Sequence, residues 1–226
     1  MRPVERGPVP VKDGQVVEFA EYQDAKPYLL ERLGNYCSYC GMRIDAGLHV
    51  EHVSPKSIDP ERCREWNNLL LACVHCNSIK SAAPTREDDC FPDTENPMLL
   101  LEYGPDARVR AMPGLTPSED ARARRIIDLV GLDRTPEHSQ YSKLDYRWIH
   151  RREAWDIAWR SLRNLRLSDT VEFREQIIAT AVADGYWPVW YAAFAGDVDL
   201  RCRLVRAVRG TCQCCFDDAG APIARP

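Results

Sequence analysis

The pattern of apolar and polar positions along the chain predicts a largely helical protein. Apolar residues recur at helical spacing in four stretches. These are residues 22–33, 118–130, 143–166 and 170–184. A fifth helix is expected over 189–208, and Gly34 and Gly131 stand where a helix C-terminus commonly takes glycine. These helices predict a mostly α fold.

The regions between these helices have different characters. Residues 1–20 read as an extended, proline-containing lead-in. Six prolines within residues 82–118 predict a stretch that is mostly loop, with a short extended segment over 96–101. We therefore expect three parts: an N-terminal lead-in and helix (1–34), a module carrying paired cysteines (35–115) and a helical domain (116–226).

Charge and composition narrow the classes of protein. The chain carries a formal net charge of -4 and has a sequence pI of about 5.8. Most proteins that bind nucleic acid unaided are basic, so a basic partner or a local basic patch would be needed for that task. No apolar run is long enough to span a membrane, and the N-terminus lacks the apolar core of a secretory signal. A cytoplasmic location without membrane partners is expected.

Four of the ten cysteines form two C-x-x-C pairs, Cys37 with Cys40 and Cys73 with Cys76. In a reducing compartment paired cysteines are more often metal ligands than disulfides. Two such pairs supply the four thiolates of a tetrahedral structural Zn²⁺ site. A thioredoxin-type redox motif or cysteines serving as small core residues would explain one pair but not the repetition.

The segment between the pairs carries polar residues whose side chains could take part in catalysis. It contains His49-Val50-Glu51-His52-Val53-Ser54-Pro55-Lys56 and returns through Asn67-Asn68-Leu69, while Asn77 directly follows Cys76. Here the chain resembles the HNH endonuclease family in three elements: C-x-x-C, Glu-His-x-x-Pro, and Asn-Leu-x-x-x-C-x-x-C-Asn-x-x-Lys. Within that family it is similar to PtuB, the HNH component of Septu and related retron antiphage defence systems. The nuclease motif covers about residues 35–80.

The resemblance implies a ββα-metal fold, in which a β-hairpin faces a helix and a zinc knuckle fixes both. With the predicted helices, this makes α+β, mostly α, the expected fold class. It also implies a partner, a PtuA-like ATPase, and in retron systems a reverse transcriptase with its non-coding RNA/DNA. Asn68 takes the position of the family's central asparagine, which orients the loop and the base histidine. The alternative for Asn68 is a residue that caps a turn.

The residue types also suit phosphodiester cleavage. The reaction needs a water nucleophile and a hard cation at the scissile phosphate. Glu51 and the side-chain oxygen of Asn77 could hold Mg²⁺ or Mn²⁺, and His52 has the side chain of a general base. The alternatives are a structural histidine at 52, a solvated strand residue at 51 and a helix N-cap at 77.

Two lysines, Lys56 and Lys80, could contact substrate phosphates, although lone lysines are as often solvated. Consecutive residues of a regular strand point to opposite faces, so Glu51 and His52 would diverge unless the hairpin is distorted. In the implied fold, such a distortion brings the ligands together.

Two features outside the module remain open. Four cysteines near the C-terminus could form a second metal site, although their spacing fits no familiar pattern: Cys202, Cys212, Cys214 and Cys215. Cys63 and Cys90 are read as ordinary residues.

Residues 143–166 carry seven basic and three acidic side chains. This excess of positive charge could face nucleic acid, although a solvated face opposite a tryptophan-rich core stripe is favoured.

These observations predict a metal-dependent HNH endonuclease that acts on DNA or RNA. Two rival readings remain. A non-catalytic zinc-binding adaptor would have no need of Glu51, His52 and Asn77 together. A solitary restriction-type HNH DNase would act without an ATPase partner.

Overall fold

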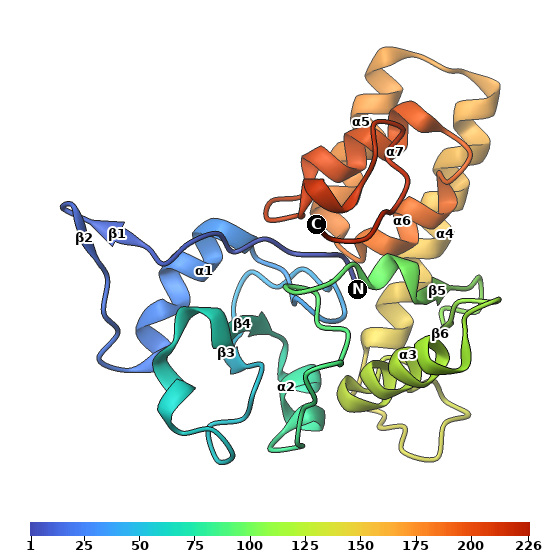
Figure 1. Cartoon of the computed structure of the whole chain (residues 1–226). Helices are drawn as coiled ribbons and strands as arrows, with labels where there is room; N and C mark the ends of the chain where they lie inside the picture. The colour runs from blue at the N-terminus through green and yellow to red at the C-terminus, as the bar shows by residue number, and fades with distance from the viewer.

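A computed structural model describes residues 1–226, and the paired cysteines lie on a ββα unit (Figure 1). Strand β3 (His49–His52) pairs antiparallel with β4 (Leu69–Ala72), so that Glu51 lies opposite Leu70 and His52 opposite Leu69. Helix α2 (Val74–Lys80) follows at once, and the Cys73 sulfur accepts a hydrogen bond from the Cys76 backbone N–H at its first turn. The mixed, mostly helical fold class is confirmed.

The N-terminal lead-in contains a small exposed hairpin, β1 (Val11–Lys12) with β2 (Gln15–Val16). The helix expected over 22–33 is present as a 3-10 turn, Tyr22–Ala25, that continues into α1 (Lys26–Leu33). It ends at Gly34, whose φ of 73° lies in the region that favours glycine.

Residues 82–118 are mostly loop, as predicted, but the extended segment expected over 96–101 was wrong in detail. Pro97–Leu99 form a 3-10 turn, because the Asn96 side chain accepts a hydrogen bond from the Met98 N–H and Pro97 suits the first helical position. Only the end of the expected segment enters a strand. That strand, β5 (Leu101–Tyr103), pairs antiparallel with β6 (Val109–Ala111).

The second half of the chain is helical. Helix α3 (Pro117–Val130) begins with a capping box between Thr116 and Glu119 and ends at Gly131, which is left-handed. Helices α4 (Arg147–Leu167) and α5 (Val171–Asp184) follow the prediction within a few residues. The single helix expected over 189–208 is instead two helices.

Those two helices are α6 (Trp187–Ala193) and α7 (Val198–Ala207). Helix α6 ends at Ala193, with Phe194 as its C-cap. The Asp197 carboxylate then accepts a hydrogen bond from the Leu200 N–H. Asp197 therefore caps a new helix within what reads as one helical pattern.

Two hydrophobic clusters make up the interior, and α4 reaches both. The first unites the N-terminal segment, the ββα unit, the β5–β6 hairpin and α3, and it includes Ala154 of α4. The second lies among α5, α6, α7 and the C-terminal part of α4, including Ala158 and Leu165. Figure 1 shows α4 running from beside α3 toward the group formed by α5, α6 and α7. None of the helices is both long enough and apolar enough to cross a membrane.

Candidate active site and metal centre

The four cysteines of the two C-x-x-C pairs converge at one point. Cys37, Cys40, Cys73 and Cys76 are all buried, and their sulfur atoms lie within 4.8 Å of one another. The sulfurs of Cys40 and Cys73 are 3.8 Å apart. A tetrahedral zinc ion with Zn–S bonds of about 2.3 Å separates its sulfur ligands by about 3.8 Å. The donor set therefore fits a structural Zn²⁺.

A buried arginine from α4 reaches this thiolate cluster. Arg147, 2% exposed, donates a hydrogen bond to the Cys76 sulfur at 3.0 Å. It also donates to the carbonyls of Val130 and Gly131 at the end of α3, at 2.8 and 2.9 Å, and pairs with Asp145 at 2.6 Å. Burial disfavours its charged form, but Cys76 and Asp145 outweigh that effect and raise the pKa of Arg147.

Glu51 points toward α2 and is fully paired. Its carboxylate is 2.6 Å from the Lys80 ammonium and accepts a hydrogen bond of 2.5 Å from the Tyr39 hydroxyl. Lys80 also donates to the His52 carbonyl oxygen at 2.6 Å. Burial raises the pKa of Glu51 to about 6, although Lys80 and Tyr39 act in the opposite direction.

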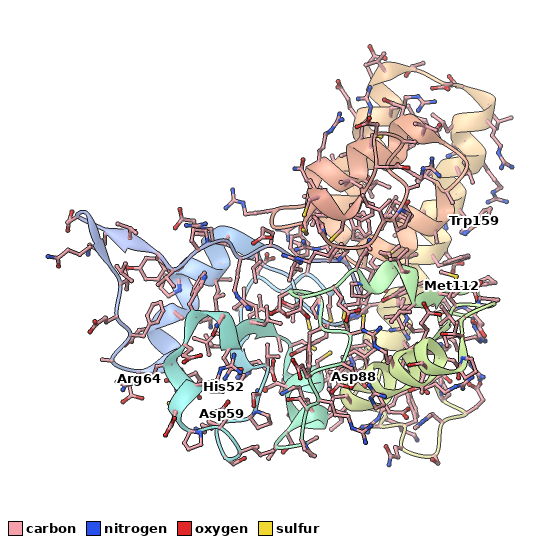
Figure 2. The ribbon with its side chains drawn as sticks, viewed as in Figure 1. His52, Asp59, Arg64, Asp88, Met112 and Trp159 are labelled. Carbon is pink, nitrogen blue, oxygen red and sulfur yellow. The ribbon has the colours of Figure 1, made fainter.

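His52 points to the other face of the same strand. Its ring lies 4.6 Å from the ring of Tyr22, and its Nε2 is 2.9 Å from the Cys63 carbonyl oxygen. Figure 2 shows His52 close to the part of the β3–β4 loop that carries Asp59 and Arg64. A carbonyl oxygen can only accept, so Nε2 carries the proton and Nδ1 is left with a free lone pair. Burial lowers the pKa of His52, which favours this neutral form.

Asn68 fixes the loop between the two strands. It is completely buried, and its Oδ1 accepts a hydrogen bond from the Ser54 N–H at 2.7 Å. Its Nδ2 donates to the carbonyls of Ser54 and Arg62 at 3.0 and 3.1 Å. The two ends of the loop are thus tied together, next to the Cys63 carbonyl that orients His52.

The other residues singled out in the sequence have varied positions. Asn77 is half-buried on α2, three residues before Lys80. Lys56 is exposed, with its ammonium 5.2 Å from the centre of the Tyr22 ring. Lys80 is 1% exposed and points inward to Glu51, so in this conformation it presents no charge to a phosphate at the surface.

Glu51 and His52 are therefore not brought to one face. The β3–β4 pairing runs without a bulge through both residues, so the distortion expected of the hairpin is absent from the strand register. The donor chemistry beside α2 still suits a hard cation, because a carboxylate and the His52 carbonyl already surround the Lys80 ammonium there.

Helix α4 is not the uniformly solvated basic face that its charge pattern favours. Arg147 and Arg151 are both 2% exposed. Arg151 donates hydrogen bonds to the carbonyls of Ala107 and Leu132, at 2.5 and 2.9 Å. These two arginines bind the first hydrophobic cluster to α4. The remaining α4 arginines are exposed: Arg152, Arg160, Arg163 and Arg166.

Several residues of this site could not be identified from the sequence. Tyr39 lies between Cys37 and Cys40, and its only sequence signal is that position. Tyr22 reads as an ordinary residue of the first helix, and Cys63 acts through its backbone oxygen, which no side-chain pattern reveals. Arg147 is seventy-one positions from Cys76, so no local motif joins them.

Comparison with known proteins addresses the ββα unit. A search of curated proteins finds no match for this chain. Residues 37–83 match the family model described as HNH endonuclease, and this segment contains both C-x-x-C pairs, β3, β4 and α2. The match covers the candidate site and leaves the helical half outside it. Residues 37–83 thus form an HNH endonuclease domain.

Proposed function

We propose that this protein is a metal-dependent endonuclease that cleaves phosphodiester bonds in DNA or RNA, with His52 as its general base. The observation that carries the proposal is the Nε2 contact of His52 with the Cys63 carbonyl at 2.9 Å. This contact leaves the Nδ1 lone pair available to take a proton from a water molecule. The HNH family match over residues 37–83 supports the same reaction class.

Glu51 and Asn77 are proposed to hold Mg²⁺ or Mn²⁺, which when bound supplies charge neutralisation at the scissile phosphate. Because Glu51 and His52 lie on opposite faces of β3, this proposal requires the strand to distort so that both reach one phosphate. The Lys80 ammonium lies on the Glu51 carboxylate and must leave it for a divalent ion to bind there. Asn68 is a positioning residue, because it fixes the loop whose Cys63 carbonyl orients His52. Lys56, exposed beside Tyr22, is proposed to contact substrate phosphate.

We further propose that the protein is the nuclease subunit of an antiphage defence complex with a PtuA-like ATPase. The support is the resemblance of the sequence to PtuB, in the C-x-Y-C, E-H-x-x-P-K and N-L-L-L-A-C-x-x-C-N-x-x-K elements. The net charge of -4 agrees with a nuclease whose partner positions the substrate. In a retron system, a reverse transcriptase and its non-coding RNA/DNA would be further components.

A cleavage assay with the ATPase present tests the enzyme proposal. Wild-type protein with Mg²⁺ or Mn²⁺ is expected to cut DNA or RNA, and His52→Ala to lose about 10²–10⁴-fold in rate. His49→Ala is the matched control, because His49 lies on the same strand but is exposed and should cut at nearly the wild-type rate. Intact nucleic acid with wild-type protein, or equal cutting by His52→Ala, contradicts the proposal.

The rival readings have separate signatures. An adaptor would bind nucleic acid or protein equally well with and without His52, and would never cut. Co-purification from the native host tests the partner: an active protein that carries no ATPase would support a solitary DNase and overturn the defence-complex proposal.

A further inference from the structure

A second group of thiols lies near the C-terminus, where a 3-10 turn spans Gln213–Cys215. The sulfur atoms of Cys212, Cys214 and Cys215 lie within 4.8 Å of one another, and those of Cys212 and Cys214 are 3.0 Å apart. Cys212 and Cys215 are buried, whereas Cys214 is exposed. Three thiols thus point to one place at the edge of the fold.

Cys202 does not belong to this group. Its thiol contacts the Asp218 carbonyl at 3.5 Å, and its sulfur lies outside the cluster. The four-cysteine site considered from the sequence is therefore wrong in its membership. The exposed side, at Cys214, leaves room for a water molecule as a fourth ligand.

The spacing of the three sulfurs is close to that of a zinc site. Tetrahedral Zn²⁺ separates thiolate ligands by about 3.8 Å. The pair at 3.0 Å would need to open by less than 1 Å, and Cys214, at the surface, is free to make that movement. Cys212 and Cys215 can stay buried when the ion binds.

Buried hydrogen bonds hold the backbone of this turn in place without the metal. The Cys212 N–H donates to the Pro3 carbonyl at 3.0 Å, and the Cys215 carbonyl accepts from Asn96 Nδ2 at 2.7 Å. Asn96 is 3% exposed. Three segments far apart in sequence therefore position the thiols before any ion binds.

An ion pair between Arg225 and Glu5 lies beside the cluster. Arg225 donates to the Val4 carbonyl at 3.1 Å and pairs at 2.5 Å with Glu5, whose carboxylate lies 3.8 Å from the Cys212 sulfur. This ion pair ties the C-terminal end of the chain to the N-terminal segment beside the thiols.

We propose that Cys212, Cys214 and Cys215 bind a second zinc ion, with water as the fourth ligand. Each thiol releases its proton to solvent when the ion binds. The ion would tie the turn to the N-terminal segment, since Val4 forms a β-bridge with Thr211 and the Cys212 N–H bonds to Pro3. Figure 1 shows the two chain ends lying near each other at this point. The role is structural and independent of nucleic-acid cleavage.

Metal analysis of the full chain, purified under reducing conditions without chelator, tests this proposal. Wild type is expected to hold about two zinc ions per chain, and Cys214→Ser about one. Cys63→Ser is the control, because Cys63 is partly exposed and lies outside both clusters, and it should keep both ions. Circular dichroism of each variant confirms that it folds.

Cobalt substitution gives a second, independent readout. The sulfur-to-cobalt charge-transfer absorbance reports the number of thiolate ligands, so wild type should exceed Cys214→Ser in proportion to the thiolates lost. One zinc ion per wild-type chain, with Cys212, Cys214 and Cys215 open to alkylation, overturns the proposal. So does a disulfide between two of them in the reduced preparation, or two zinc ions retained by Cys214→Ser.

Discussion

Replacing Arg147 by methionine should destabilise both the helical half and the zinc knuckle. The side chain is 2% exposed and donates hydrogen bonds to Cys76, Asp145 and the end of α3. Methionine fills a similar volume but leaves the Asp145 carboxylate, 4% exposed, without its cation. Breaking a buried ion pair by removing one partner costs about 3–5 kcal/mol.

That free energy corresponds to a measurable shift. In a chain of this size, each kcal/mol lowers the melting temperature by about 2–4 °C, so Arg147→Met should melt about 6–20 °C below wild type. The lost hydrogen bond to a zinc-binding thiolate should weaken zinc binding by about 10–100-fold. Thermal unfolding measures the melting temperature, urea unfolding measures the free energy, and competition with a chromophoric chelator measures zinc affinity.

Arg152→Met is the matched control, because Arg152 is an exposed arginine on the same helix. It should change the free energy of unfolding by no more than about 0.5 kcal/mol. If Arg147→Met and Arg152→Met unfold at the same urea concentration and hold zinc equally, Arg147 does not couple α4 to the knuckle as argued.

Three further predictions concern the ββα unit. Asn68→Ala should lower the free energy of unfolding by about 1–3 kcal/mol, since it leaves buried loop groups unpaired, whereas the exposed Asn67→Ala should stay within about 0.5 kcal/mol in the same urea titration. Lys80→Met should cost about 3–5 kcal/mol at a pH high enough to keep Glu51 ionised, and less as the pH falls, because loss of the ammonium raises the pKa of Glu51 above its wild-type value of about 6 and protonation then removes the unpaired charge; a cost that stays constant as the pH falls would contradict this expectation. The acid limb of the cleavage rate should lie below pH 6.5, because burial lowers the pKa of His52 and keeps it neutral there; a limb at or above pH 6.5 in the rate profile excludes His52 as the base.

The lowered pKa of His52 also makes the free energy of unfolding depend on pH. The unfolded chain takes up the proton near pH 6.5, whereas the folded chain takes it up only at a lower pH. The histidine therefore stabilises the fold above pH 6.5, and this contribution is lost as the pH falls through the folded pKa.

Local patterns predicted the parts of the structure that depend on local chemistry. The spacing of Cys37, Cys40, Cys73 and Cys76 predicted a four-sulfur cluster, because two tight C-x-x-C turns can meet at one metal. Gly34 and Gly131 marked helix ends, because both adopt positive φ.

Features that depend on pairing between distant segments were missed for a physical reason. Arginine is seldom fully buried, so a basic helix reads as a solvated face, yet Arg147 and Arg151 lie inside with their charges satisfied by distant carbonyls and a thiolate. The pairing of Lys80 with Glu51 depends in the same way on how α2 packs on β3. The break at Asp197 was missed because its capping role needs only one hydrogen bond.

The hydrogen bond from Arg147 to the Cys76 sulfur also affects the order in which the chain folds during synthesis. Residues 37–83 leave the ribosome about 60 residues ahead of Arg147, which at ordinary rates of synthesis is roughly 3–12 s. During that interval the nascent HNH domain lacks the arginine that donates hydrogen bonds to Cys76 and to the end of α3. The HNH domain thus attains its final geometry only after the start of α4 has been made.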